Sequence, residues 1–71
     1  MISERLQKLV DDMVEKGVRY DDAVREFDKR FITRVLNGAG GSLTKTADAL
    51  GMHRNTLSRK MGEYKIKRRI P

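Results

Sequence analysis

The sequence predicts an all-α fold of four helices in a single domain over residues 1–71, and three observations support this prediction. Apolar residues recur at spacings of three and four along residues 2–16 and 20–36, which is the period of an amphipathic helix. Two shorter helical patterns follow, joined at Gly51. No segment is a strand candidate. A cysteine-free chain of 71 residues has a small core and no disulfides, so we expect a partner to stabilise it.

The first predicted helix covers residues 2–16. Gly17 is placed to end it in a left-handed conformation. Its apolar side chains form one stripe. The stripe has more apolar side chains than a single contact over two helical turns would need. They are Ile2, Leu6, Leu9, Val10, Met13 and Val14.

The second predicted helix begins at Asp21 and Asp22, because negative charge is favourable at the positive end of a helix dipole. It ends near Leu36 and carries three of the four aromatic residues of the chain. We therefore expect this helix to form the centre of the core. Its broad apolar face comprises Tyr20, Ala23, Val24, Phe27, Phe31, Ile32, Val35 and Leu36.

Residues 37–41 contain three glycines and predict a loop, because glycine is costly inside a helix. The segment does not fit the dinucleotide-binding pattern Gly-x-Gly-x-x-Gly, because Leu43 stands where the last glycine is needed. No strand precedes it, as such loops require.

Residues 42–64 predict two short helices with a tight turn between them. Ser42 is a good N-cap for a helix over 43–50, and Gly51 suits the turn that follows. The next helix begins near His53 or Arg54, ends near Tyr64, and presents basic and amide side chains outward. This is the pattern of a helix-turn-helix, which places its second helix in the major groove of DNA.

The charge distribution agrees with a nucleic-acid partner. Residues 1–36 hold eight basic and eight acidic residues, whereas residues 37–71 hold eight basic and two acidic ones. The whole net charge of +6 therefore lies in the half that contains the helix-turn-helix. The alternative is a solvated basic surface that only aids solubility.

Catalytic and membrane functions are disfavoured. With one histidine and no cysteine, the chain cannot form a histidine-based metal site or a Cys–His pair. We therefore expect no enzyme, cofactor, metal or small-molecule substrate. No apolar run approaches the ~20 residues that span a bilayer, and Glu4 and Arg5 interrupt any signal peptide. The expected location is the cytoplasm, at the nucleoid if the source is bacterial.

Residues 41–65 resemble the helix-turn-helix of the Fis family. The resemblance is carried by Ser-Leu-Thr-Lys-Thr-Ala at 42–47, Leu-Gly-Met at 50–52 and Arg-Asn-Thr-Leu-Ser-Arg-Lys-Met at 54–61. The C-terminal domain of NtrC-type enhancer-binding activators carries a similar Arg-Asn-Thr-Leu run. The Phe27 to Leu36 pattern fits the family's second helix, whereas residues 2–16 match only by position.

The resemblance implies an intertwined homodimer that binds double-stranded DNA and bends it. Residues 2–36 would form the dimer core, residues 42–64 the helix-turn-helix, and residues 65–71 a basic tail. The role implied is that of a transcriptional regulator or nucleoid-associated factor. Recombinase stimulation is not expected, because Met1 leads almost directly into the first helix. The dimer core would comprise Ile2, Leu6, Leu9, Val10, Met13, Val24, Phe27, Phe31 and Val35.

The expected base contacts come from the start of the recognition helix. Arg54 matches a family arginine that reads a base, and a guanidinium can bond the O6 and N7 atoms of guanine together. His53 stands where Fis has a base-contacting asparagine, and Asn55 and Ser58 complete the set. The expected phosphate contacts are Ser42, Thr44, Lys45, Thr56, Arg59 and Lys60.

Two other interpretations stay open at this point. The chain resembles the C-terminal DNA-binding domain of an NtrC-type activator closely enough to be such a domain, separated from its ATPase. It also fits a basic helical dimerisation module that docks on an acidic protein or a membrane surface.

Overall fold

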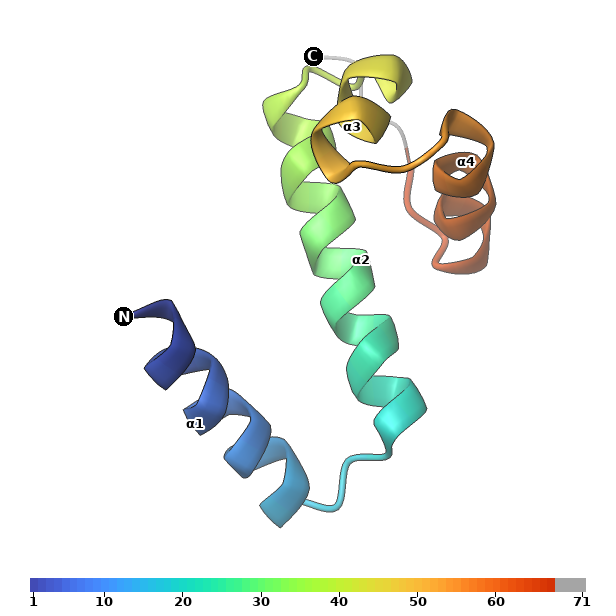
Figure 1. Ribbon diagram of the computed structural model, residues 1–71. Coiled ribbons are helices and arrows are strands. Elements are labelled where there is room, and N and C mark those ends of the chain that lie inside the picture. The colour runs from blue at the N-terminus through green and yellow to red at the C-terminus, as the bar shows by residue number, and fades with distance from the viewer. Residues whose placement is uncertain (68–71) are drawn as a thin grey trace.

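The computed structural model describes residues 1–67, so Arg68 and Arg69 of the predicted basic tail lie outside the described part. Four helices occupy it and no strand occurs within residues 1–67 (Figure 1). The all-α prediction is confirmed. The helices are α1 (Ile2–Glu15), α2 (Tyr20–Gly38), α3 (Leu43–Leu50) and α4 (Arg54–Glu63).

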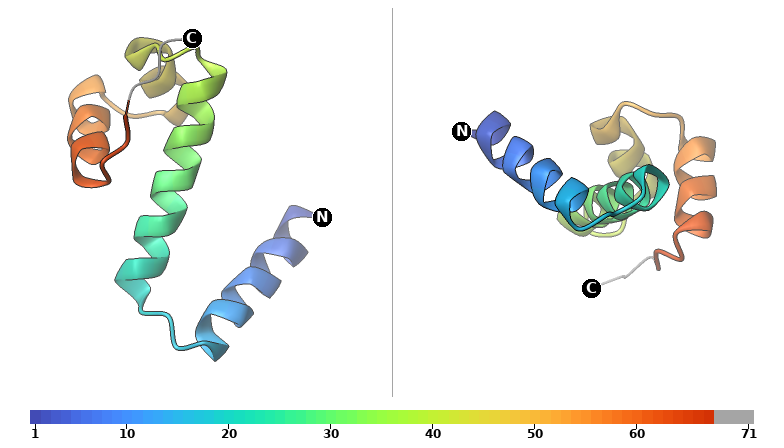
Figure 2. Two further views of the ribbon diagram at one scale, coloured as in Figure 1. Left: turned by 180° about the vertical axis from the view of Figure 1, so that it is seen from behind. Right: turned by 90° about the horizontal axis from the view of Figure 1, so that it is seen from below.

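The long helix α2 connects two different parts of the molecule. From its N-terminal end α1 runs back at an angle, so that the two helices diverge like the arms of a V (Figures 1 and 2). Helices α3 and α4 pack together at and beside the C-terminal part of α2. The helix-turn-helix is therefore carried at one end of α2 and α1 at the other.

The buried core lies entirely in the C-terminal part. Leu57 of α4 is completely buried, and Ile32 and Leu36 of α2 pack with it. Partly buried side chains around this core include Tyr64 and Ile66, so the chain beyond α4 is held against the core as far as Ile66. The remaining core residues are Ala47 and Met61, with Leu43, Leu50 and Met52 packed against them.

The apolar stripe of α1 is present, but it is not covered within one chain. None of the residues of α1 is buried, and Ile2 is 84% exposed. The rings of Phe27 and Phe31 on α2 are also about half exposed, with their centroids 5.4 Å apart. A large part of the hydrophobic surface is thus left open on α1 and on the N-terminal part of α2.

Helix α2 has two apolar faces instead of the single broad face that its sequence suggests. Ile32 and Leu36 pack against α3 and α4, whereas Phe27 and Phe31 point to a different side and remain exposed. The expectation that α2 is the centre of the core is therefore correct only for its C-terminal part. The physical reason is that a straight helix turns by about 100° per residue, so residues five positions apart lie far apart around its axis.

Helix α2 is longer than predicted, because it continues through Asn37 to Gly38. The backbone amide of Ala39 still donates to the carbonyls of Val35 and Leu36, so the helical hydrogen bonds continue beyond the buried Leu36. The chain leaves the helical conformation only at Gly40 and Gly41, both with positive φ. The glycine-rich segment is therefore a tight turn of two left-handed residues after a complete helix.

Candidate nucleic-acid interface

The turn between α3 and α4 is set by local hydrogen bonds. Ser42 caps α3, because its Oγ accepts a hydrogen bond from the backbone amide of Lys45 at 3.2 Å. At the other end Gly51 is left-handed, with φ of 70°, and the amide of Met52 bonds to the carbonyl of Ala47 at 3.0 Å. This glycine-dependent ending turns the chain sharply, and α4 begins three residues later. The predicted helix-turn-helix is confirmed.

A small interior fixes α3 against α4. Ala47 of α3 and the completely buried Leu57 of α4 belong to one core cluster. Thr46 is completely buried as well, and its hydroxyl donates a 2.7 Å hydrogen bond to the carbonyl of Ser42. A polar residue at this position was not expected from the sequence, and its hydrogen bond removes the cost of burying it.

His53 caps the recognition helix α4. Its Nδ1 accepts a hydrogen bond from the backbone amide of Asn55 at 3.0 Å, and the ring is exposed. In the neutral imidazole an accepting Nδ1 carries no proton, so Nε2 carries it and is a hydrogen-bond donor. His53 therefore both orders the first turn of α4 and offers a donor beside Arg54.

The other side chains expected to contact DNA lie on this same unit. Arg54, Asn55, Ser58 and Arg59 are exposed on α4, and Thr56 is partly buried. On α3 the exposed residues are Thr44 and Lys45, while Ser42 is partly buried at the cap. The fold thus gathers the predicted base-contacting and phosphate-contacting residues on two adjacent helices (Figure 1).

Lys60 differs from this set, because its ammonium group is already paired. Its Nζ lies 3.2 Å from Oδ2 of Asp28 on α2, and the hydroxyl of Tyr64 donates to the same oxygen at 2.7 Å. The Lys60 Nζ also lies 5.9 Å from the centre of the Tyr64 ring. We call these three residues the Asp28 clasp. The sequence prediction missed it.

The Asp28 clasp changes the acidity of its members. The hydrogen bond from Tyr64, supported by Lys60, holds the pKa of Asp28 below its ordinary value, against the opposing effect of burial. The same bonds raise the pKa of Lys60 and the pKa of Tyr64, because each donor is stabilised by the Asp28 carboxylate. At neutral pH the clasp therefore contains one negative and one positive charge.

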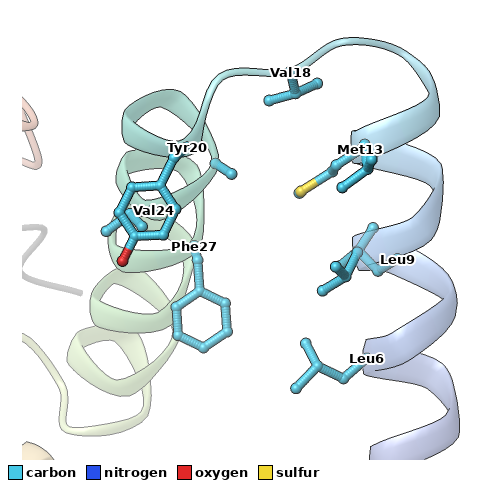
Figure 3. Close-up of a pocket in the computed structure, with 10 residues that line it drawn as sticks. Leu6, Leu9, Met13, Val18, Tyr20, Val24 and Phe27 are labelled. Atoms are coloured by element: carbon cyan, nitrogen blue, oxygen red, sulfur yellow. The ribbon is translucent and has the colours of Figure 1, made fainter.

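The exposed apolar surface forms a groove between α1 and α2. The groove has a volume of about 390 Å³. Figure 3 shows Leu6, Leu9 and Met13 directed from α1 toward the side on which α2 carries Val24 and Phe27. The full lining is Leu6, Leu9, Val10, Met13, Val14, Val18, Tyr20, Ala23, Val24 and Phe27.

A comparison with protein families supports the assignment of this unit. Residues 23–64, more than half of the chain, match the family described as bacterial regulatory proteins of the Fis family. The chain belongs to the Fis family. The matched range begins in α2 and includes the Asp28 clasp, α3 and α4, but not α1. Comparisons with curated proteins and with solved structures gave no significant match.

Membership in the Fis family has direct consequences for the chemistry. The family is a family of DNA-binding helix-turn-helix domains without enzymatic activity, which agrees with the prediction that the chain is not an enzyme. Within residues 1–67 no group of three histidine, aspartate or glutamate side chains is arranged to hold a metal ion. None of the helices described is both long and apolar enough to cross a membrane.

Proposed function

We propose that this Fis-family chain is a sequence-specific DNA-binding protein that acts as a homodimer and bends its DNA. Its role is that of a transcriptional regulator or nucleoid-associated factor in the bacterial cytoplasm. The observation that carries the proposal is the division of α2. One of its faces packs against the helix-turn-helix, and the other is apolar and exposed beside an equally exposed α1.

The exposed apolar surface supports the homodimer. A helix of 14 residues such as α1 is marginal in water on its own, so it needs a packing partner. A second copy of the chain supplies the same apolar face, as a two-fold interface requires. The proposed dimer contacts are Ile2, Leu6, Leu9, Val10, Met13, Val24, Phe27, Phe31 and the partly buried Val35.

The start of α4 supports sequence-specific recognition. Arg54 lies in the first turn and is exposed, where its guanidinium can bond to O6 and N7 of a guanine. The Nε2 donor of His53 suits the same guanine acceptors, the N7 of adenine or the O4 of thymine. Asn55 and Ser58 are the further proposed base contacts.

Backbone contacts to DNA are proposed around this site. Thr44 and Lys45 lie in the first turn of α3 and are exposed, so their side chains can reach phosphate. Ser42, Thr56 and Arg59 extend the set. Lys60 is left out, because its ammonium is paired with Asp28.

A binding-site selection from randomised duplexes at a stated salt concentration tests the proposal, because salt changes the affinity of any phosphate contact. We expect an enriched two-fold symmetric site. Because we propose that the DNA is bent, complexes with the site near the middle of the fragment should migrate more slowly in a circular-permutation gel than complexes with the site near an end. Arg54→Ala should lose preference at one base pair in each half-site, at a cost of about 1–3 kcal/mol. Equal affinity for random and selected duplexes would instead support a basic module that docks without sequence preference.

A further inference from the structure

The two sides of α4 carry different kinds of residues. Lys60 and Tyr64 are four positions apart and therefore lie on one face of the helix, beside the buried Leu57 and Met61. Arg54 and Asn55, at the start of the helix, are exposed. Lys60 thus belongs to the side that meets α2.

The Asp28 clasp links parts of the chain that are distant in sequence. Lys60 and Tyr64 lie 32 and 36 positions from Asp28, and their hydrogen bonds reach a single carboxylate oxygen. The Lys60 side chain is 29% exposed and that of Asp28 is 28% exposed, so the pair is partly shielded from water. Charge-assisted hydrogen bonds of this kind are directional, whereas the apolar contacts of Leu57 and Met61 are not.

These properties distinguish two roles for Lys60. A lysine that binds phosphate must have its ammonium group free to displace a cation from the DNA, and Lys60 would have to leave Asp28 first. A lysine that stays on Asp28 fixes the rotation of α4 about its own axis and its tilt against α2. The distances of the clasp favour the second role.

We infer that Lys60 is a positioning residue, which together with Tyr64 uses Asp28 to set the orientation of the recognition helix against α2, and that it is not a phosphate contact. The inference rests on the proposed DNA-binding function and deepens it. Because α2 also carries the exposed apolar face, the clasp fixes how the base-contacting residues are aimed relative to that face.

The salt dependence of DNA binding separates the two roles. We compare Lys60→Met and Asp28→Asn with Lys45→Met, a matched loss of charge at an exposed lysine of α3. Lys45→Met should lower the slope of log affinity against log salt by about 0.9 for each protomer. Lys60→Met should weaken binding about tenfold and leave this slope unchanged, because a lost charge-assisted bond misaligns α4 without removing a phosphate contact. Asp28→Asn should have the same effect, and the double variant should be little weaker than either.

Two results would overturn the inference. One is a slope for Lys60→Met that falls as it does for Lys45→Met. The other is tighter binding and a steeper slope for Asp28→Asn, because that substitution would release a lysine that binds phosphate. Tyr64→Phe guards against misfolding, since it keeps the partly buried ring and removes only the hydroxyl that bonds to Asp28. It should also weaken binding without changing the slope.

A measurement without DNA separates failure of the inference from failure of the proposed function. If the wild-type chain binds no selected duplex, the proposed function is wrong. Amide NMR spectra of the free protein then test whether the Asp28 clasp positions α4. Asp28→Asn should then shift the amide resonances of α4 around Lys60 and Tyr64 while those of α3 stay in place. An α4 spectrum identical to that of the wild type would show that Asp28 does not position the helix.

Discussion

Replacing Phe27 with alanine tests whether the exposed face of α2 is a dimer surface. Phe27 lines the groove between α1 and α2 and is 52% exposed in the single chain. Complete burial of a phenylalanine side chain is worth up to about 3 kcal/mol, so roughly half of that, about 1.5 kcal/mol, is still to be gained by each copy. A symmetric dimer contains the residue twice, which gives about 3 kcal/mol. Since 1.4 kcal/mol is tenfold in affinity, Phe27→Ala should raise the dimer dissociation constant by about 100-fold.

Sedimentation equilibrium over a concentration series measures this constant, and circular dichroism on the same samples follows the helix content. Lys29→Ala is the matched control, because Lys29 is exposed on the same helix but does not line the groove. It should leave the constant unchanged. A wild-type chain that sediments as a folded monomer at micromolar concentration would refute the reasoning. So would a Phe27→Ala variant whose dissociation constant equals that of the wild type.

Three further predictions concern stability. Leu57→Ala removes a completely buried side chain and should lower the free energy of unfolding by about 2–5 kcal/mol in a urea titration. A decrease in that free energy as small as the one caused by a substitution at an exposed position would contradict the core assigned here. Lys65 has a φ of 56°, so Lys65→Gly should raise the thermal midpoint through about 1 kcal/mol of relieved strain, while an unchanged or lower midpoint would mean that the strain is not there. The Asp28 clasp should make stability depend on pH at both extremes. The pKa of Asp28 is lowered from 3.8, so its contribution is complete above that value and is lost as the pH falls through the lowered pKa. The pKa of Tyr64 is raised from 10.0, so its contribution is complete below pH 10.0 and is lost as the pH rises through the raised pKa. Tyr64→Phe should remove its share of the alkaline loss in urea titrations across this range, and an unaltered pH profile would argue against the clasp.

The sequence predicted the features that depend on local chemistry. Ser42 as N-cap, Gly51 in the turn and a fourth helix that begins near His53 or Arg54 all follow from residues within a few positions of one another. The structure shows the Ser42 cap, a left-handed Gly51 and a helix that begins at Arg54. The end of α2 was less predictable. Glycine costs about 1 kcal/mol in a helix, but the burial of Leu36 fixes the last turn and the helix continues to Gly38.

The features that the sequence did not predict depend on which neighbour each face of α2 meets. Periodicity shows that Phe27 and Ile32 are both apolar, but it does not show that they serve different surfaces. Asp28 stands at spacings of four and eight from Ile32 and Leu36, which places it on the buried face of α2. Arg25, three positions earlier, is available to it as a local partner, so the sequence does not identify Lys60 or Tyr64 as its partners.

The continuity of α2 also restricts how the length of this chain can vary. Phe27 and Ile32 lie on one unbroken helix, so their faces are held at a fixed angle of about 140°. An insertion or deletion of a single residue between them would rotate one face against the other by about 100° and shift it by about 1.5 Å. Such a change of length would reorient the recognition helix relative to the exposed apolar face of α2. It would remove no contact within the helix-turn-helix or within the pair α1 and α2. The turn of residues 16–19 lies outside this unbroken helix, so a change of length there leaves the angle between the two faces of α2 unchanged.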